Sequence, residues 1–150
     1  LSQVVARGIA VLDPGIKDAD EALGALAKAA SRELGVPASV LQDGLRRRER
    51  LWPTALPEGI ALPHAILPEI TRTLVVPMYV PFGVPMAAQE PRSDVIIGLF
   101  AGPGNPDDHV RLLGRLARIA SDPRALASLR TVPSANDLVH RLLELDAAHA

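Results

Sequence analysis

Residues 94–100 constrain the fold of this 150-residue chain most strongly, because Val95, Ile96 and Ile97 stand in an unbroken apolar row. A strand that is apolar on both of its faces needs cover on both, and such strands occur where helices pack on the two faces of a sheet. The segment therefore predicts a buried strand inside a layered α/β domain.

Capping patterns place helices on both sides of this strand. Asp18 is followed three residues later by Glu21, which is the capping-box pattern, and Gly35 is a natural stop for that helix. Asn, Pro and two acids at 105–108 form a strong helix start. The expected helices begin at Asp18, Pro37, Asn105, Asp122 and Ser134.

Three more strands are expected at 8–12, 59–62 and 74–80, and Pro77 marks the last of these as an edge strand or a bulged one. No repeat or internal linker interrupts the chain. We predict one α/β domain over residues 1–150, a three-layer sandwich with a mixed β-sheet flanked by helices on both faces. The start at Leu1 rather than at a methionine is compatible with excision from a longer chain.

Composition excludes several classes of function. The formal net charge of -1 provides no overall field for nucleic acid or an anionic membrane. The apolar run at 74–86 contains three prolines and is too short to span a bilayer. The chain has no cysteine and no signal-peptide pattern over residues 1–12. We expect a cytoplasmic protein with no nucleic-acid partner and no direct membrane insertion.

The four histidines carry the candidate chemistry. None has the spacing of a helix-borne metal site, and His140 and His149 are interpreted as surface residues near the C-terminal end. His64 follows a strand and Pro63, where a side chain is presented at the rim of a sheet. His109 lies in the first turn of a capped helix, which favours an anion. Together with nearby arginines, these two histidines form a candidate phosphoryl site.

The arginines at positions 46, 47, 48 and 50 have two interpretations. Because they stand near the end of the second expected helix, they complement the negative end of its dipole and can be simple surface charge. Alternatively, some of them serve the candidate phosphoryl site. The residues alone leave both interpretations open.

The segment 48–65 resembles the signature of the fructose/mannitol-type enzyme IIA family of bacterial sugar phosphotransferase systems. The positions that fall in register without a gap are Arg48, Glu49, Thr54, Gly59, Ala61, Pro63 and His64. Residues 99–103 and 108–113 are similar to the family's second histidine segment. The ending from Ser121 through Leu129 is most similar to its nitrogen-regulatory branch. The resemblance covers nearly the whole chain.

This resemblance implies a phosphocarrier. His64 would accept a phosphoryl group from a histidine-containing phosphocarrier protein. It would pass the group to a sugar-permease IIB domain, or hold it as a signal for a regulatory target protein. Arg48 and His109 would stabilise the phosphoryl oxygens. The resemblance implies neither a cofactor nor a metal, and the activity would be that of a protein-histidine phosphotransferase.

Two departures from the family pattern keep other functions open. Glu58 adds a carboxylate before the strand that leads to His64, and it is expected near the phosphate. Ala65 and Ile66 stand where a basic residue often follows the histidine. One alternative is therefore a degenerate, non-phosphorylated regulatory module that binds a partner protein or transporter. The other is a domain that binds a small anion in the same pocket.

Overall fold

A computed structural model of the chain describes residues 4–5, 10–13, 15–104 and 106–149. The elements alternate as the sequence predicts, with two helices, a group of strands and three further helices. In chain order they are β1 (Val11–Leu12), α1 (Ala19–Leu34), α2 (Ala38–Leu51), β2 (Ile60–Ala61), β3 (His64–Ile66), β4 (Leu74–Val84), β5 (Ser93–Ala101), α3 (Pro106–Ala120), α4 (Pro123–Leu129) and α5 (Ala135–Ala148).

Local capping explains where the helices begin. The Asp18 carboxylate accepts a hydrogen bond from the Glu21 amide at 2.8 Å. The Glu21 carboxylate accepts one from the amide of Lys17, whereas in a capping box it would accept from the amide of Asp18. The side chain of Asp122 caps α4 and that of Ser134 caps α5 in the same manner. These starts are confirmed. The expected cap Asn105 and part of the expected strand at 8–12 lie outside the described residues.

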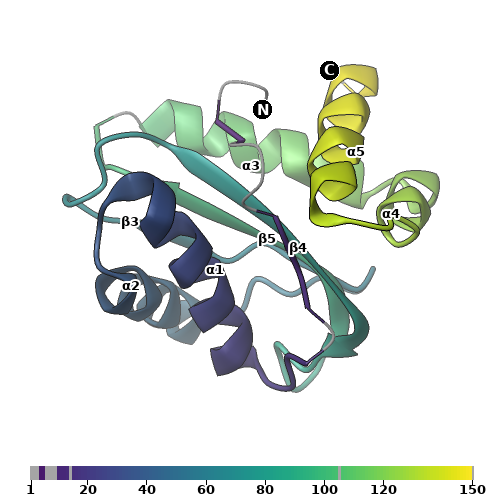
Figure 1. Cartoon of the computed structure of the whole chain (residues 1–150), viewed down its shortest axis with the longest axis horizontal. Coiled ribbons are helices and arrows are strands. Elements are labelled where there is room, and N and C mark those ends of the chain that lie inside the picture. Colours follow the sequence, from purple (N-terminus) through teal and green to yellow (C-terminus); the bar gives the residue numbers. More distant parts are fainter. Residues whose placement is uncertain (1–3, 6–9, 14, 105, 150) are drawn as a thin grey trace.

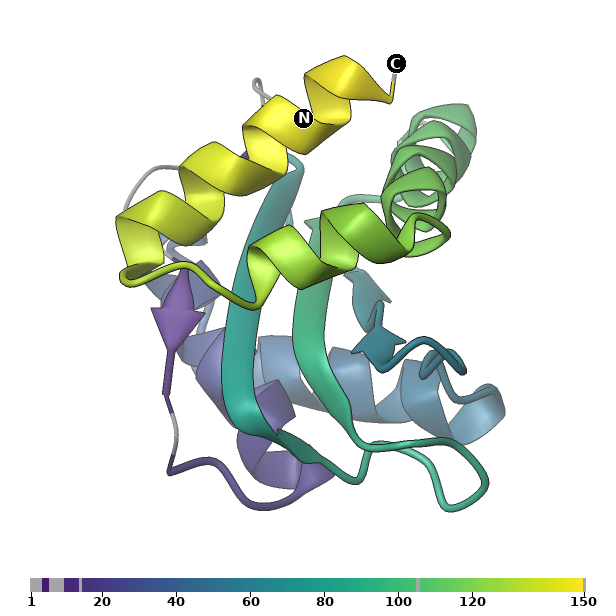
Figure 2. The ribbon, with the colours of Figure 1, turned by 90° about the vertical axis from the view of Figure 1, so that its right-hand side faces the viewer.

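The five strands form one mixed sheet in the order β1-β4-β5-β2, and β3 also pairs with β5. β4 and β5 are antiparallel and run side by side as its two long strands (Figure 2). The pairings of β1 with β4, and of β2 and β3 with β5, are parallel. The predicted mixed sheet of a single α/β domain is therefore confirmed.

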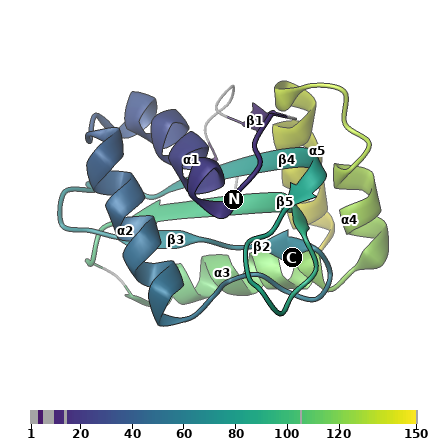
Figure 3. The same cartoon turned by 90° about the horizontal axis from the view of Figure 1, so that it is seen from below.

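Helices cover both faces of this sheet, which makes three layers (Figure 1). One apolar cluster joins α1 and α2 to one face, and its strand residues include Ile96 and Phe100. The other joins α3, α4 and α5 to the opposite face through residues such as Val95 and Ile97. The view in Figure 3 shows α1 and α2 crossing the near side of the strands. The apolar row of β5 is buried because each of its faces meets a helix layer.

Pro77 does not make β4 an edge strand, which corrects half of the expectation from sequence. β4 lies between β1 and β5. The Val75 amide donates to Val4, away from β5, and amides two residues apart point to the same side of a strand. The backbone nitrogen of residue 77 thus faces away from β5. The absence of an N–H group in Pro77 therefore removes no hydrogen bond to β5, in which Ile97 is its pairing partner. The irregularity in β4 falls further along, between Tyr79 and Val84.

Candidate functional site

His64 lies on the edge of the sheet, within a segment that pairs with β5 in a constant register. Ile60 pairs with Val95 before Pro63, and His64 pairs with Leu99 after it. The amide of Leu99 donates to the carbonyl of Pro63 at 2.9 Å, so the proline does not break the pairing. The segment therefore holds His64 on a rigid strand.

Strand alternation decides which face His64 uses. Ala65 packs in the cluster of α1 and α2, whereas Leu99, the partner of His64, packs in the cluster of α3 to α5. Paired residues in a sheet project to the same side. His64 therefore projects towards the layer of α3, and α2 reaches it around the sheet edge.

Gly44 allows α2 to approach that edge closely. A Cβ atom at this position would stand 2.9 Å from a methyl carbon of Leu67 and 3.2 Å from the Cβ of Ala65. A glycine inside a helix costs stability, and it is tolerated where packing requires it. One turn after Gly44, the same helix presents Arg48 to His64.

Hydrogen bonds determine the tautomer of His64. Arg48 donates from Nε to His64 Nε2 at 2.9 Å, and His64 Nδ1 lies 3.1 Å from the carbonyl oxygen of Leu62. A guanidinium group can only donate, so Nε2 must accept and the ring proton must sit on Nδ1, which donates to Leu62. The ring is neutral, and Nε2 carries its lone pair.

The surroundings of His64 also favour the neutral ring. Burial lowers its pKa below the usual 6.5, because a charged imidazolium loses solvation there. The Leu62 carbonyl opposes the shift, the charge of Arg48 lowers the pKa further, the Glu49 carboxylate opposes it, and the nearby His109 lowers it slightly. His64 therefore favours the neutral ring, whose Nε2 lone pair accepts the hydrogen bond of Arg48.

Two contacts hold Arg48 and its helix end in place. Arg48 Nη1 donates to the carbonyl oxygen of Trp52 at 2.7 Å. The Glu49 carboxylate accepts the hydroxyl of Thr54 and, at 3.2 Å, the amide of the same residue. Glu49 thereby ties the end of α2 to the segment that leads into β2. The sequence did not point to the Leu62 and Trp52 carbonyls, because backbone acceptors leave no residue signature.

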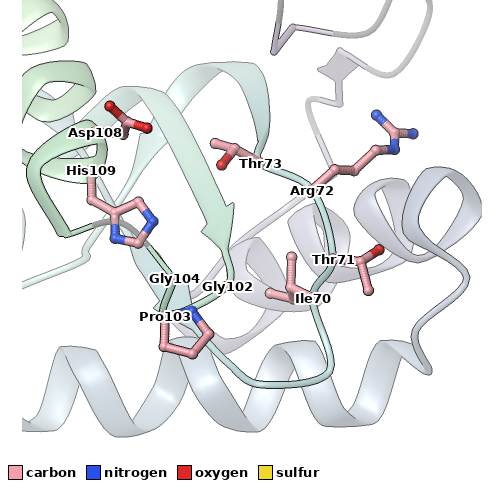
Figure 4. A pocket seen from close by; sticks show the side chains of 9 residues that line it. All are labelled: Ile70, Thr71, Arg72, Thr73, Gly102, Pro103, Gly104, Asp108 and His109. Carbon is pink, nitrogen blue, oxygen red and sulfur yellow. The ribbon is translucent and has the colours of Figure 1, made fainter.

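His109 lies on α3 and is 7% exposed. Its ring projects towards the turn at 102–104, beside a hollow of about 310 Å³ that the loop at 70–73 closes on the other side (Figure 4). No described residue forms a hydrogen bond with this ring. His109 and His64 line different hollows, and the smallest of the causes that lower the pKa of His64 comes from His109.

A second hollow, of about 350 Å³, opens directly at His64. We name it the His64 hollow; its lining includes Arg47, Arg48, Leu51, His64, Ile66 and Leu67. No carboxylate of the described residues lines it. The arginines near the end of α2 thus divide into two that line the hollow and two, Arg46 and Arg50, that do not.

Glu58 lies away from His64, which corrects the expectation that its carboxylate stands near the phosphate. It lines a hollow of about 310 Å³ together with Phe82, Arg92, Asp94 and Arg130; we name this the Glu58 hollow. The carbonyl oxygen of its neighbour Gly59 accepts a hydrogen bond from the Asp94 amide at the start of β5. His64, in contrast, pairs with Leu99 near the end of that strand. The departure at Glu58 therefore does not bear on His64.

Two further observations concern the described part of the chain. No helix in that part of the chain is both long and apolar enough to cross a membrane. No group of three or more histidine, cysteine, aspartate or glutamate side chains within it is arranged to hold a metal ion.

Comparison with known proteins agrees with this architecture. Residues 5–145 match the family model of the phosphoenolpyruvate-dependent sugar phosphotransferase system, EIIA 2. A nitrogen regulatory protein of Bradyrhizobium diazoefficiens is 30% identical over 132 residues, covering 87% of this chain and 85% of that protein.

Solved structures share the fold. The nitrogen regulatory protein IIA-Ntr from Neisseria meningitidis superimposes with a TM-score of 0.86 at 22% identity, over 93% of this chain and 97% of its own. The complex of enzyme IIAMTL with phosphorylated enzyme IIBMTL from Escherichia coli matches with a TM-score of 0.76 at 22% identity, over 94% and 99%. With the family model matching most of its length, this chain belongs to the EIIA 2 family of phosphotransferase-system phosphocarrier domains.

Proposed function

We propose that this EIIA domain carries its phosphoryl group on Nε2 of His64. One observation carries the assignment: the Nδ1 proton of His64 is directed to the Leu62 carbonyl, while Nε2 presents its lone pair to the guanidinium of Arg48. A nucleophile is thereby oriented next to a cation, and the His64 hollow gives it access from solvent. Phosphoryl transfer depends mainly on positioning and on stabilisation of charge.

The phosphoryl group passes from a histidine of the donor protein to His64, and one nitrogen–phosphorus bond forms as the other breaks. The lone pair of His64 Nε2 forms a bond to phosphorus as the nitrogen–phosphorus bond of the donor breaks, and that electron pair returns to the donor ring. His64 keeps its proton on Nδ1 and becomes a phosphorylated imidazolium, while a donor ring that was protonated leaves as neutral imidazole. The Leu62 carbonyl, 3.1 Å from Nδ1, stabilises the positive charge that develops on the His64 ring.

Arg48 and His109 would stabilise the phosphoryl oxygens. The Arg48 Nε–H occupies the Nε2 lone pair in this structure, so the guanidinium must leave that position for attack and can then donate to the oxygens. His109 lies in the first turn of α3, where amide groups and the helix dipole favour an anion. Its ring forms no hydrogen bond with a described residue and is free to donate.

The proposed partners follow from the family. The donor is a histidine-containing phosphocarrier protein, which is typical of EIIA domains. The acceptor is a IIB domain, as in the complex of IIAMTL with phosphorylated IIBMTL, or a regulatory target protein, as the similarity to nitrogen regulatory proteins favours. Because these donors act in the cytoplasm, the proposal places this domain there.

The test is incorporation of labelled phosphate from phosphoenolpyruvate, with enzyme I and the histidine-containing carrier from the same organism. Wild-type protein should become labelled and His64→Ala should not, because this variant removes the proposed nucleophile. His140→Ala is the matched control, since His140 is exposed on α5, and it should label like wild type. Label on His64→Ala would mean that the nucleophile is another residue. Unlabelled wild type with a competent donor would indicate the regulatory module.

A further inference from the structure

We propose that Arg47 is a second cation for the phosphoryl group on His64, an inference that rests on the function proposed above. The EIIA pattern that this chain matches includes Arg48, not Arg47. The assignment comes from the position of Arg47, from the state of its charge, and from the charges that surround it.

Arg47 shares one face of α2 with the residues that meet the edge strand. Gly44, Arg47, Arg48 and Leu51 follow the spacing i, i+3, i+4 and i+7, which lines up side chains along a helix. All four line the His64 hollow. Because Gly44 brings this face against Ala65 and Leu67, Arg47 stands at the opening through which a phosphoryl group would reach His64.

The charge of Arg47 is not used elsewhere in the described part of the chain. Arg46 is paired with Asp20 at 2.6 Å and with Asp43 at 3.1 Å, and Arg48 is bound to His64 and Trp52. Arg47 is exposed and forms no hydrogen bond or ion pair with any described residue. Its guanidinium can therefore turn into the hollow without breaking an existing contact.

The lining of the His64 hollow suits a dianion. Arg47 and Arg48 are its two permanent cations, and no carboxylate of the described residues lines it. A phosphoryl group in transfer spreads negative charge over three equatorial oxygens, more than one guanidinium can bind in its fork geometry. The segment after His64 offers no charge, since Ala65 and Ile66 follow. Arg47, on α2, supplies the positive charge that Ala65 and Ile66 do not provide.

The chain contains a matched control in Arg50. It is exposed on the same helix, it has no ion pair with a described residue, and it does not line the hollow. Arg47→Ala and Arg50→Ala remove the same charge, so a difference between them reports position rather than net charge. Both residues are exposed, and both variants should fold, which circular dichroism and thermal unfolding can verify.

The experiment compares both variants with wild type in two measurements. The first is the initial rate of phosphoryl transfer from the phosphorylated histidine-containing carrier. The second is the ³¹P NMR titration of the phosphohistidine. Arg47→Ala should slow transfer on the order of 10-fold, less than a fully preorganised donor would, because the side chain is exposed. It should also raise the pKa of the phosphoryl group, since a cation near the dianion is lost.

Arg50→Ala should match wild type in both measurements, and Arg47→Lys should restore part of the rate because it keeps the charge but not the fork. If wild type becomes phosphorylated and Arg47→Ala equals Arg50→Ala in rate and in titration, the role of Arg47 is refuted while the carrier function stands. If wild type takes no phosphate, both proposals fail together.

Discussion

Two arginine-lined hollows lie towards opposite ends of β5, and they use their arginines in different ways. In the Glu58 hollow, Arg130 donates to the Asp94 carboxylate at 2.9 Å and to the Glu58 carbonyl at 2.9 Å. Arg92 donates there to the carbonyls of Phe82 and Gly83. In the His64 hollow, Arg48 meets a neutral imidazole, and Arg47 meets no partner among the described residues.

The difference supports the proposed site, because what distinguishes the two hollows is whether their arginines already have oxygen partners, not how many arginines each contains. An arginine saturated by carboxylate and carbonyl oxygens holds chain segments together and has little left to offer an anion. At the Glu58 end, Gly59 has a φ of 84° and a Cβ there would stand 2.9 Å from Arg130, so that turn is built around the guanidinium. The His64 end keeps its positive charge available.

The largest expected effect is the loss of phosphoryl-transfer rate in Arg48→Ala, with Arg130→Ala as the comparison. Arg48→Ala should slow phosphoryl transfer to His64 on the order of 10²–10³-fold, because one oriented donor to the phosphoryl oxygens is lost. Arg130→Ala should leave the rate close to wild type but lower the free energy of unfolding by about 1 kcal/mol, since its ion pair is partly exposed. Transfer kinetics and urea denaturation measure the two effects.

The proposed difference between a functional Arg48 and a structural Arg130 would be wrong if Arg130→Ala slowed phosphoryl transfer as strongly as Arg48→Ala while remaining folded. That result would mean that the two ends of the sheet are coupled. If both variants lost the same free energy of unfolding and both transferred phosphate at the wild-type rate, Arg48 and Arg130 would each have only a structural role.

A smaller effect concerns the titration of the His64 ring. Its pKa lies below 6.5 because of burial, with Arg48 and His109 adding to the shift. At pH values between this lowered pKa and 6.5, the unfolded chain binds more protons than the folded one, so His64 contributes stability that rises with pH across this window. Histidine ring signals in NMR should give a midpoint below 6.5 for wild type. Arg48→Ala should raise that midpoint, and Arg130→Ala should not move it.

His149 is the internal reference for this titration, because its pKa is shifted in the opposite direction. The Asp122 carboxylate, 2.8 Å from Nε2, and the Leu145 carbonyl raise it above 6.5. Its contribution to stability is present below pH 6.5 and is lost as the pH rises through the raised pKa. A His64 midpoint at or above that of His149 would contradict the burial and the charge environment described for the site.

The smallest expected effect is that of Glu58→Gln. Because Glu58 lines the hollow at the other end of the sheet, removing its charge should leave the rate of transfer to His64 unchanged. The same kinetic assay applies. A clear acceleration would restore the interpretation from sequence, in which this carboxylate repels the incoming phosphoryl group.

Features that depend on near neighbours could be predicted from the sequence. The starts of α1, α4 and α5 follow from side chains that cap amides two or three residues away. The burial of β5 follows from its apolar row, which needs cover on both faces. The candidate residues His64, Arg48 and His109 came from residue types beside predicted element ends and from a family pattern.

Predictions failed where the partner is distant in the chain. The strand of Pro77 was expected to be an edge strand or a bulged one. It is irregular between Tyr79 and Val84, but it is not an edge strand, because the backbone position where Pro77 lacks an N–H group faces away from β5. Glu58 was expected beside the phosphate, but it lies in the turn before β2, next to the start of β5, whereas His64 pairs near the end of β5. His149 does lie near the surface at the C-terminal end, as expected, but the sequence did not reveal that Asp122, 27 residues away, contacts its ring.

The sequence by itself determined the helices, the long strands, the three layers and the family, because caps, apolar rows and motif residues act through adjacent positions, but it did not predict β3. Only the tertiary structure decided which charges are free. Arg47, Arg92 and Arg130 are equivalent in the sequence, yet their availability depends on the oxygen atoms that folding brings within about 3 Å, the range of a hydrogen bond. The partners that neutralise a guanidinium are not revealed by the order of the chain. The sequence could therefore name candidate residues for an anion site, but it could not tell which arginines have their charge available.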